Sequence, residues 1–291
     1  MKPAPFTYHR ARSVDEALAL LAGAGDARIL AGGQSLVPML NLRLAMPEHL
    51  IDISRIAELD HVEERGGRIA IGAATRQRTI EFSPLVAARL PLLAAAILHV
   101  GHRQTRNRGT LGGSLCHLDP SAELALMACV HDAQLVARSP RGERVLTMAA
   151  FALGTMTTAL EPDEMLTEVR FSPWPAGHGF GFHEFARRHG DWAMASAAAL
   201  VTLDGAGRIE RAALALGGVA DTPLRHATAE AMLIGQAPGD ALLRRAAVLP
   251  QDVVVLDDDA TPAWYRRQLA ETMARRALAD AVGRAAKAAR Q

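Results

Sequence analysis

The sequence predicts an α+β protein with a two-part N-terminal domain and a smaller C-terminal α+β domain. Strand and helix patterns alternate at the start of the chain, and strands with a period of two begin near Gly67. The stretch SPWPAGHGFG is rich in Pro and Gly and lacks apolar periodicity, and after it strands come before helices. We therefore place the N-terminal domain at 1–175, with subdomains at about 1–55 and 56–175, and the C-terminal domain at 178–286.

The first subdomain is predicted to be a small alternating unit of strands and helices. Ser13–Glu16 has the spacing of a capping box, and apolar residues follow at helical intervals up to Gly23. Short buried strands are expected at 28–31 and 50–53, with an amphipathic helix at 36–44 between them. A strand-to-helix turn therefore falls at the carboxyl end of the first strand, where ligands tend to bind.

The remaining elements follow from the same patterns. The expected elements of the second subdomain are a strand at 68–73, a long apolar helix at 90–101, a helix after 109–124 and a strand pair at 133–139 and 143–148. Those of the C-terminal domain are strands at 193–204 and 207–218 and helices at 228–235 and 261–290.

Composition excludes several classes of function. The 291 residues are 49% apolar, which is enough for large cores, and 32 Lys+Arg against 31 Asp+Glu leave a formal charge of +1. Such a balance gives no electrostatic basis for binding nucleic acid or an anionic membrane, and no apolar run approaches the ~18 residues of a membrane span. Cys116 and Cys129 are the only cysteines, so we expect a reducing cytoplasm and no iron–sulfur cluster in this chain.

Two Gly-Gly pairs are the most informative motifs. Gly32-Gly33 and Gly112-Gly113 each follow an apolar segment, and a serine comes shortly after each pair, Ser35 and Ser114 respectively. Consecutive N–H groups without side chains can form a nest for phosphate oxygens, and two such loops suit a pyrophosphate. Neither matches GxxxxGK[ST] or GxGxxG, so the residues alone leave open whether these are phosphate loops or two ordinary turns.

Metal and nucleophile sites have weaker support. His99, His102 and His117 are candidates for a metal site together with Cys116 or Asp119, but they show no known spacing of metal ligands. Cys116 has no Cys-His-Asn arrangement around it. We therefore predict no metal site and no catalytic residue.

Two further features have alternative interpretations. Arg103, Arg106 and Arg108 are expected to form a solvated or partner-facing stretch, or to reach an anionic ligand. Trp192 stands where a strand is expected to start, and its indole either packs in the core or stacks on a planar cofactor.

Four stretches of the chain resemble one protein family. They are AGGQSLVPMLNLRLAMPEHLIDI, VGHRQTRNRGTLGGSLCHLDPSAELALM, RRHGDWAMASAAALV and ALGGVADTPLR, which follow one another over essentially the whole chain. The chain resembles the FAD-binding medium subunit of the molybdenum hydroxylases, a family with carbon monoxide, nicotinate and xanthine dehydrogenases among its members. The resemblance implies a two-subdomain FAD-binding domain of the PCMH type followed by the smaller C-terminal domain.

The resemblance also implies which positions contact the cofactor. The pyrophosphate of FAD would lie between the two loops, an acidic residue after the second loop would contact the cofactor, and an aromatic residue would approach the flavin. Carried onto this sequence, the positions are Leu30, Ala31, Gly32, Gly33, Gln34, Ser35, Leu36, Gly101, Thr110, Leu111, Gly112, Gly113, Ser114, Glu123, Leu166, Arg187 and Trp192. Glu123 replaces the more common aspartate, and Ser114 replaces a frequent asparagine.

The implied function is that of an electron-transfer subunit of an oxidoreductase. Electrons would pass from 2Fe–2S clusters of a small partner subunit, which receives them from a large molybdenum subunit, through FAD to an external acceptor. The expected assembly is a cytoplasmic dimer of heterotrimers. The alternatives are a free-standing FAD-dependent oxidase or dehydrogenase, and a scaffold that has lost FAD.

Overall fold

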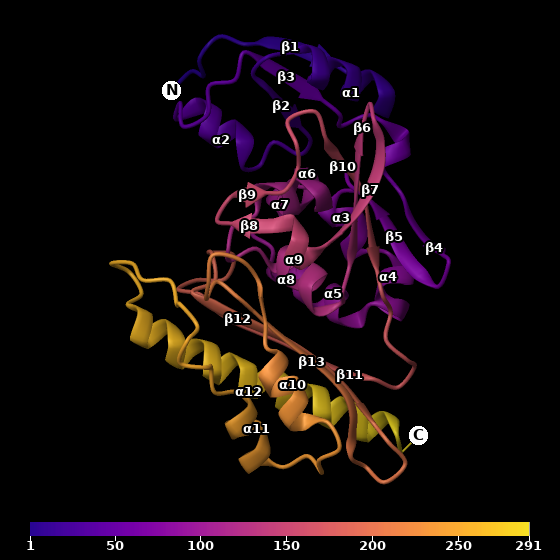
Figure 1. Cartoon of the computed structure of the whole chain (residues 1–291), viewed down its shortest axis with the longest axis vertical. Helices are drawn as coiled ribbons and strands as arrows, with labels where there is room; N and C mark the ends of the chain where they lie inside the picture. The colour runs from indigo at the N-terminus through magenta and orange to yellow at the C-terminus, as the bar shows by residue number, and fades with distance from the viewer. Residues whose placement is uncertain (291) are drawn as a thin grey trace.

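The computed structural model describes residues 1–290, which form three parts stacked along the long axis of the molecule (Figure 1). The N-terminal part lies at one end, the C-terminal part lies at the other, and a larger mixed part joins them. None of the helices in the described range is both long and apolar enough to cross a membrane.

The first part is a three-stranded parallel sheet in the order β1-β3-β2, with two helices. Its elements are β1 (Thr7–Arg10), α1 (Val14–Gly23), β2 (Ala27–Leu30), α2 (Leu36–Asn41) and β3 (His49–Asp52). Ser13 caps α1 as predicted, because its hydroxyl accepts the Glu16 N–H, but the Glu16 carboxylate accepts the N–H of Arg12 at 2.7 Å, one residue before the N-cap position of a standard capping box. Helix α2 is shorter than predicted, because the chain reverses soon afterwards, at Arg43, in a left-handed conformation (φ 57°).

The second part is a five-stranded antiparallel sheet in the order β4-β5-β10-β6-β7, packed against short helices. Its first elements are η1 (Ala57–Leu59), β4 (Val62–Arg65), β5 (Arg68–Gly72), α3 (Gln77–Glu81), α4 (Pro84–Arg89), α5 (Pro91–Ala96), η2 (Ile97–His99) and α6 (Arg103–Arg108). They are followed by α7 (Leu111–His117), α8 (Glu123–Val130), β6 (Gln134–Ser139), β7 (Gly142–Thr147), α9 (Met148–Phe151), β8 (Ala152–Gly154), β9 (Thr157–Thr158) and β10 (Met165–Phe171).

Two predictions for the second part were wrong. The single long helix expected at 90–101 is α5 followed by the 3₁₀ turn η2, and the chain then turns at Gly101 (φ 48°). The second Gly-Gly pair is not a turn, because Gly112 and Gly113 lie in the first turn of α7. Thr110 starts that helix by accepting the Gly113 N–H on its hydroxyl at 3.0 Å.

The C-terminal part is an antiparallel sheet in the order β11-β12-β13-β14. Its elements are β11 (Gly179–Phe185), β12 (Ala195–Leu203), β13 (Ile209–Gly217), β14 (Leu224–Arg225), α10 (Ala227–Leu233), α11 (Asp240–Ala246) and α12 (Ala263–Ala288). Helix α12 lies on β11 at a distance that only glycine permits, since a Cβ on Gly179 would be 1.7 Å from the Ala281 carbonyl oxygen. The opposite face of the sheet supplies Leu200 and Ala213 to the core of the second part. The C-terminal sheet and the second part are thus joined by one continuous core.

Candidate functional site

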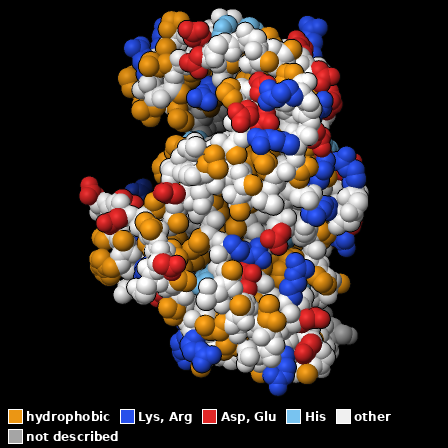
Figure 2. Space-filling model, in the orientation of Figure 1, with side chains coloured by type: hydrophobic (Ala, Val, Ile, Leu, Met, Phe, Trp, Pro, Cys, Tyr) orange, Lys and Arg blue, Asp and Glu red, His pale blue; other side chains and the backbone are white. Residues whose placement is uncertain are grey.

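A cavity of about 1290 Å³ lies between the first and second parts and reaches the loop before β12. It is larger than the roughly 300–1,000 Å³ of a typical small-molecule site. Figure 2 shows this face hollowed between the uppermost part of the molecule and the part below it. The cavity therefore has room for an extended cofactor such as a dinucleotide.

The first Gly-Gly loop presents free hydrogen-bond donors to the cavity. Residues 31–36 all line it, and the backbone N–H groups of 32–36 donate to no other group within residues 1–290. Loop N–H groups that have no protein acceptor are suited to anionic oxygens.

The two glycines of this loop are required for different reasons. Gly33 has a left-handed backbone (φ 72°), which side chains rarely tolerate. Gly32 lies directly against the other loop, since a Cβ there would be 2.3 Å from the Arg108 carbonyl oxygen and 2.9 Å from the Gly109 Cα. Gly32 thus allows the backbones of the two subdomains to touch beside the cavity.

The second Gly-Gly pair differs from the first because its N–H groups are already bonded. Leu111 and Gly112 donate to the carbonyls of Thr75 and Ala73 at 3.1 and 2.8 Å, and Gly113 donates to Thr110. A Cβ on Gly112 would be 2.6 Å from the Ala73 Cβ, so a glycine at this position allows α7 to pack closely against the end of β5. The wall offered by α7 consists of the exposed Gly113 backbone and neighbouring side chains.

An unpaired acceptor lies in the same wall. The Gln77 side chain lines the cavity, and its Oε1 is buried without a hydrogen-bond partner in the described part of the chain. It lies against Gly109, where a Cβ would be 2.5 Å from this oxygen. A buried unpaired acceptor costs stability unless a ligand or water donates to it.

Arg106 stabilises the segment of the cavity wall that includes Val100 and Gly101. The prediction that Arg106 faces solvent or a partner was wrong. Its guanidinium is buried, bonds to Glu81 at 2.9 Å and donates to the carbonyl of Val100 at 3.1 Å. This bond helps to hold the segment that includes Gly101, which lines the cavity. Arg103 and Arg108 are exposed.

Glu123 and Trp192 lie where the cavity reaches the C-terminal part. Burial raises the pKa of the Glu123 carboxyl to about 7, and the nearby Glu184 carboxylate adds to this effect. Trp192 precedes β12 on a loop and is 79% exposed although it lines the cavity. Of its two interpretations, the structure excludes core packing.

The structure brings most of the predicted positions together. The cavity lining includes Ala31, Gly32, Gly33, Gln34, Ser35, Leu36, Gly101, Thr110, Gly112, Gly113, Ser114, Glu123, Leu166 and Trp192. Leu30, Leu111 and Arg187 are outside this lining, and Leu111 is fully buried. Gln77 and residues of the segment 156–165 also contribute to the lining, but no recognisable motif marks them in the sequence, and Asp119 was considered only as a metal ligand.

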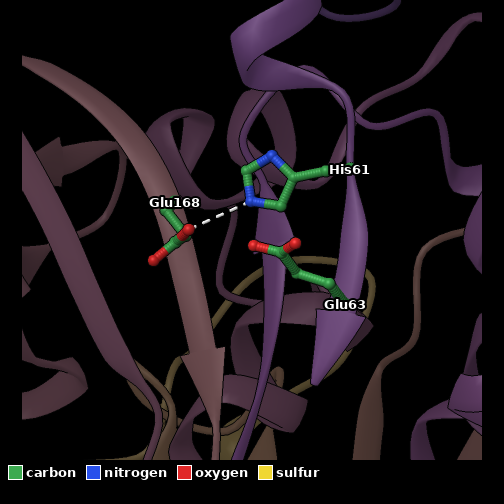
Figure 3. Close-up of side chains that lie close together, drawn as sticks. All are labelled: His61, Glu63 and Glu168. Carbon is green, nitrogen blue, oxygen red and sulfur yellow. Dashed lines mark hydrogen bonds and ion pairs between the residues drawn. The ribbon is translucent and has the colours of Figure 1, made fainter. Parts of the chain in front are cut away.

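One cluster elsewhere has the composition of a metal site. The ligand atoms of His61, Glu63 and Glu168 lie within 4.8 Å of one another, and Figure 3 shows them pointing toward one another from β10 and the β4 segment. However, Glu168 also bonds to the guanidinium groups of Arg65 and Arg170. These cations already balance the carboxylate charge, so the cluster is an ion-pair network.

The sequence and structure match known proteins over nearly the whole chain. Residues 4–174 match the family described as the FAD binding domain in molybdopterin dehydrogenase, and residues 180–281 match the CO dehydrogenase flavoprotein C-terminal domain. The chain belongs to the family of FAD-binding medium subunits of molybdenum hydroxylases.

Relatives within this family are similar along their full length. The 6-hydroxypseudooxynicotine dehydrogenase complex subunit alpha of Paenarthrobacter nicotinovorans is 41% identical over 98% of this chain and 97% of its own. The carbon monoxide dehydrogenase medium chain of Hydrogenophaga pseudoflava is 39% identical over 98% and 100%. A solved structure of quinoline 2-oxidoreductase from Pseudomonas putida superposes with a TM-score of 0.93, at 35% identity, over 98% and 99%.

The cavity fits the cofactor of this family. The free N–H groups of 32–36 suit the two phosphates of FAD, and the unpaired oxygen of Gln77 suits a hydroxyl donor. The exposed indole of Trp192 offers an apolar face at the end of the cavity nearest the C-terminal part. The pyrophosphate, the polar ribityl chain and the planar flavin of FAD are thus matched by the loop N–H groups, Gln77 and Trp192 respectively.

Proposed function

We propose that this chain binds one FAD noncovalently in the cavity and passes electrons from 2Fe–2S clusters of a partner subunit to an external acceptor. The observation that carries the proposal is the first loop, whose residues line a dinucleotide-sized cavity and whose five consecutive N–H groups at 32–36 have no acceptor within residues 1–290. Family membership supports the choice of FAD over other dinucleotides.

Each wall of the cavity has a distinct task in this proposal. The N–H groups of 32–36 hold the pyrophosphate, with the hydroxyls of Thr110 and Ser114 on the facing wall, and Gln77 accepts a hydroxyl of the ribityl chain. The remaining proposed contacts within the cavity lining are Ala31, Gly101, Gly112, Gly113, Glu123, Leu166 and Trp192. Leu30, Leu111 and Arg187, which lie outside the lining, stay predictions from the family resemblance. Bound flavin supplies the electron transfer, and the protein positions it and excludes water.

The electron donors are proposed to lie on other chains. Two cysteines are too few for a cluster, and relatives are named as subunits, for example the medium chains of carbon monoxide dehydrogenase. We propose a complex with a 2Fe–2S small subunit and a large molybdenum-cofactor subunit, assembled as a dimer of heterotrimers in the cytoplasm. A solved relative is described as lacking the Mo-pyranopterin moiety of the molybdenum cofactor, which is consistent with such a partner.

The test is an anaerobic reduction of the flavin with and without the partners. The isolated chain and the complex co-expressed with its genomic neighbours are mixed with candidate organic substrates, and the visible flavin bands are followed. Bleaching only in the complex is expected. Rapid substrate-dependent bleaching of the isolated chain would show a free-standing oxidase or dehydrogenase, and a colourless chain that takes up no FAD would refute the cofactor assignment.

A further inference from the structure

A group of acidic and histidine side chains lies behind the cavity wall, where the second and C-terminal parts meet. Glu123 begins α8 and lines the cavity, His99 ends η2, and Glu184 lies on β11. His99 Nδ1 and Glu184 Oε1 are 2.9 Å apart. Three elements that are distant in sequence therefore bring titratable groups to one place.

Glu184 is the least satisfied member of the group. Its side chain is only 7% exposed, and its second oxygen, Oε2, has no hydrogen-bond partner among residues 1–290. A buried carboxylate oxygen without a hydrogen-bond donor costs stability. Its partner His99 packs edge-on against Phe182 with ring centroids 4.9 Å apart, which fixes the imidazole in place.

The charges that act on Glu123 are mostly negative. Burial is the main reason that the pKa of its carboxyl is raised, and the charges of Glu184 and Asp119 raise it further, whereas a backbone hydrogen bond and the charge of His99 lower it. The hydrogen bond to Glu184 in turn raises the pKa of His99. Arg225 of β14 bonds to carbonyls at the far, C-terminal end of α8.

The other neighbours of α8 add little charge. Helix α7 contributes Cys116 and His117 to the same cavity wall, and α5 carries no titratable side chain. Glu184, Asp119 and His99 thus all act on Glu123, and the His99 ring also packs edge-on against a second imidazole, His189, with centroids 6.1 Å apart. The carboxyl groups favour one additional proton on the group.

We propose that Glu123, His99 and Glu184 form one proton-holding cluster, and that binding of FAD draws one proton from solvent onto it. The proposal rests on the proposed function, because it assumes that FAD occupies the cavity. The pyrophosphate brings two negative charges and the cofactor displaces water from around Glu123. Both effects disfavour the carboxylate, so a proton from the buffer adds to one of its oxygens when FAD binds.

The sign of the resulting pH dependence follows from linkage. In the FAD-free chain the pKa of Glu123 is about 7, and bound FAD raises it further. Below pH 7 both states are protonated and the affinity is independent of pH. Above pH 7 the free chain must first take up a proton, so the Kd for FAD rises by up to about tenfold per pH unit.

The experiment measures FAD binding to the FAD-free full-length chain between pH 6 and 9. Quenching of flavin fluorescence gives the Kd, and calorimetry in two buffers of different ionisation enthalpy counts the protons. For wild type we expect a flat Kd below pH 7, a rising Kd above it, and uptake approaching one proton per FAD at pH 8.

Three variants separate this role from a structural one. Glu123→Gln should remove the pH dependence of the Kd, and Glu184→Gln should shift the onset of the rise to lower pH, because one negative charge acting on Glu123 is lost. Asp191→Asn is the matched control, since Asp191 is an exposed cavity-lining carboxylate beside Trp192, and it should keep the wild-type profile.

Two results would overturn the proposal by itself. The first is FAD binding by wild type without proton uptake at pH 8. The second is a Kd for FAD that Glu184→Gln changes by the same factor at every pH, which would mean a purely structural role for Glu184. Both can be read even if Glu123→Gln does not fold. Absence of FAD binding at every pH would instead overturn the proposed function together with this inference.

Discussion

Gly32→Ala tests whether the approach of the two subdomains creates the cofactor site. The added Cβ would be 2.3 Å from the Arg108 carbonyl oxygen, whereas real Cβ contacts are essentially never shorter than 3.0 Å. The loops must therefore separate by roughly 0.7 Å, and both neighbouring atoms are backbone, which cannot rotate away as a side chain can.

The cost of this overpacking is about 1–3 kcal/mol. If the loops separate freely in the FAD-free chain, the strain returns only when FAD draws them together. The Kd then rises by roughly 5- to 150-fold while the stability of the FAD-free chain stays unchanged, since about 1.4 kcal/mol corresponds to tenfold. If the loops cannot separate, the same free energy appears as lost stability instead.

The assay combines an FAD titration with urea unfolding on the same preparation. Gly23→Ala is the matched control, because Gly23 ends α1 in the same subdomain, lacks a positive φ and has nothing within 4 Å of the point where an added Cβ would lie. That control should be neutral or slightly stabilising, by up to about 1 kcal/mol. Gly32→Ala with both a Kd and a stability equal to wild type would refute the argument.

Three further predictions concern individual side chains. Because an unfolded carboxyl ionises near pH 4.5 and Glu123 near 7, the FAD-free chain should lose about 3 kcal/mol of stability over that range, and Glu123→Gln, measured by urea unfolding at pH 8, should be more stable than wild type. Burial lowers the pKa of His131 to about 4, so its neutral form adds stability that is complete above pH 6.5 and is lost by about 3 kcal/mol as the pH falls to 4. His131→Gln should remove that part of the acid sensitivity and His102→Gln, at an exposed site, should not; equal acid sensitivity in both would contradict this. Trp192→Ala should leave the Tm of the FAD-free chain nearly unchanged, because the indole is exposed, but should reduce the quenching of tryptophan emission by FAD, and undiminished quenching would show that Trp192 does not approach the flavin.

Local signals in the sequence were sufficient for elements whose ends are fixed by their own residues. Ser13 caps α1 as expected, and the predicted strands at 50–53 and 68–73 correspond closely to β3 and β5. The long helix expected at 90–101 failed because apolar periodicity does not show where a helix changes to a 3₁₀ turn. The domain limits at 1–175 and 178–286 stay a prediction.

The candidate site was harder to predict because its defining contacts are tertiary. The sequence placed two similar Gly-Gly pairs at two loops, but only Gly33 has a left-handed backbone, and Gly112 is helical. Which N–H groups are free depends on Thr75 and Ala73, whose carbonyls accept the donors of the second pair. No pattern of residue types within either loop carries that information.

The arrangement of the three cores indicates how the cavity keeps its shape. The C-terminal sheet shares one core with the second part, so the loop that carries Trp192 and the β11 residue Glu184 are positioned by the same rigid unit that carries α7 and α8. The first part has a mostly separate core, to which the second part contributes Ala74 and Met165, and beside the cavity Gly32 lies against the Arg108–Gly109 backbone. One cavity wall is thus the edge of a small domain with free N–H groups, and the other is a large unit that holds the acidic cluster. A cofactor with an anionic centre satisfies the first wall and adds negative charge beside the second. The same binding event therefore both joins the subdomains and favours protonation of Glu123.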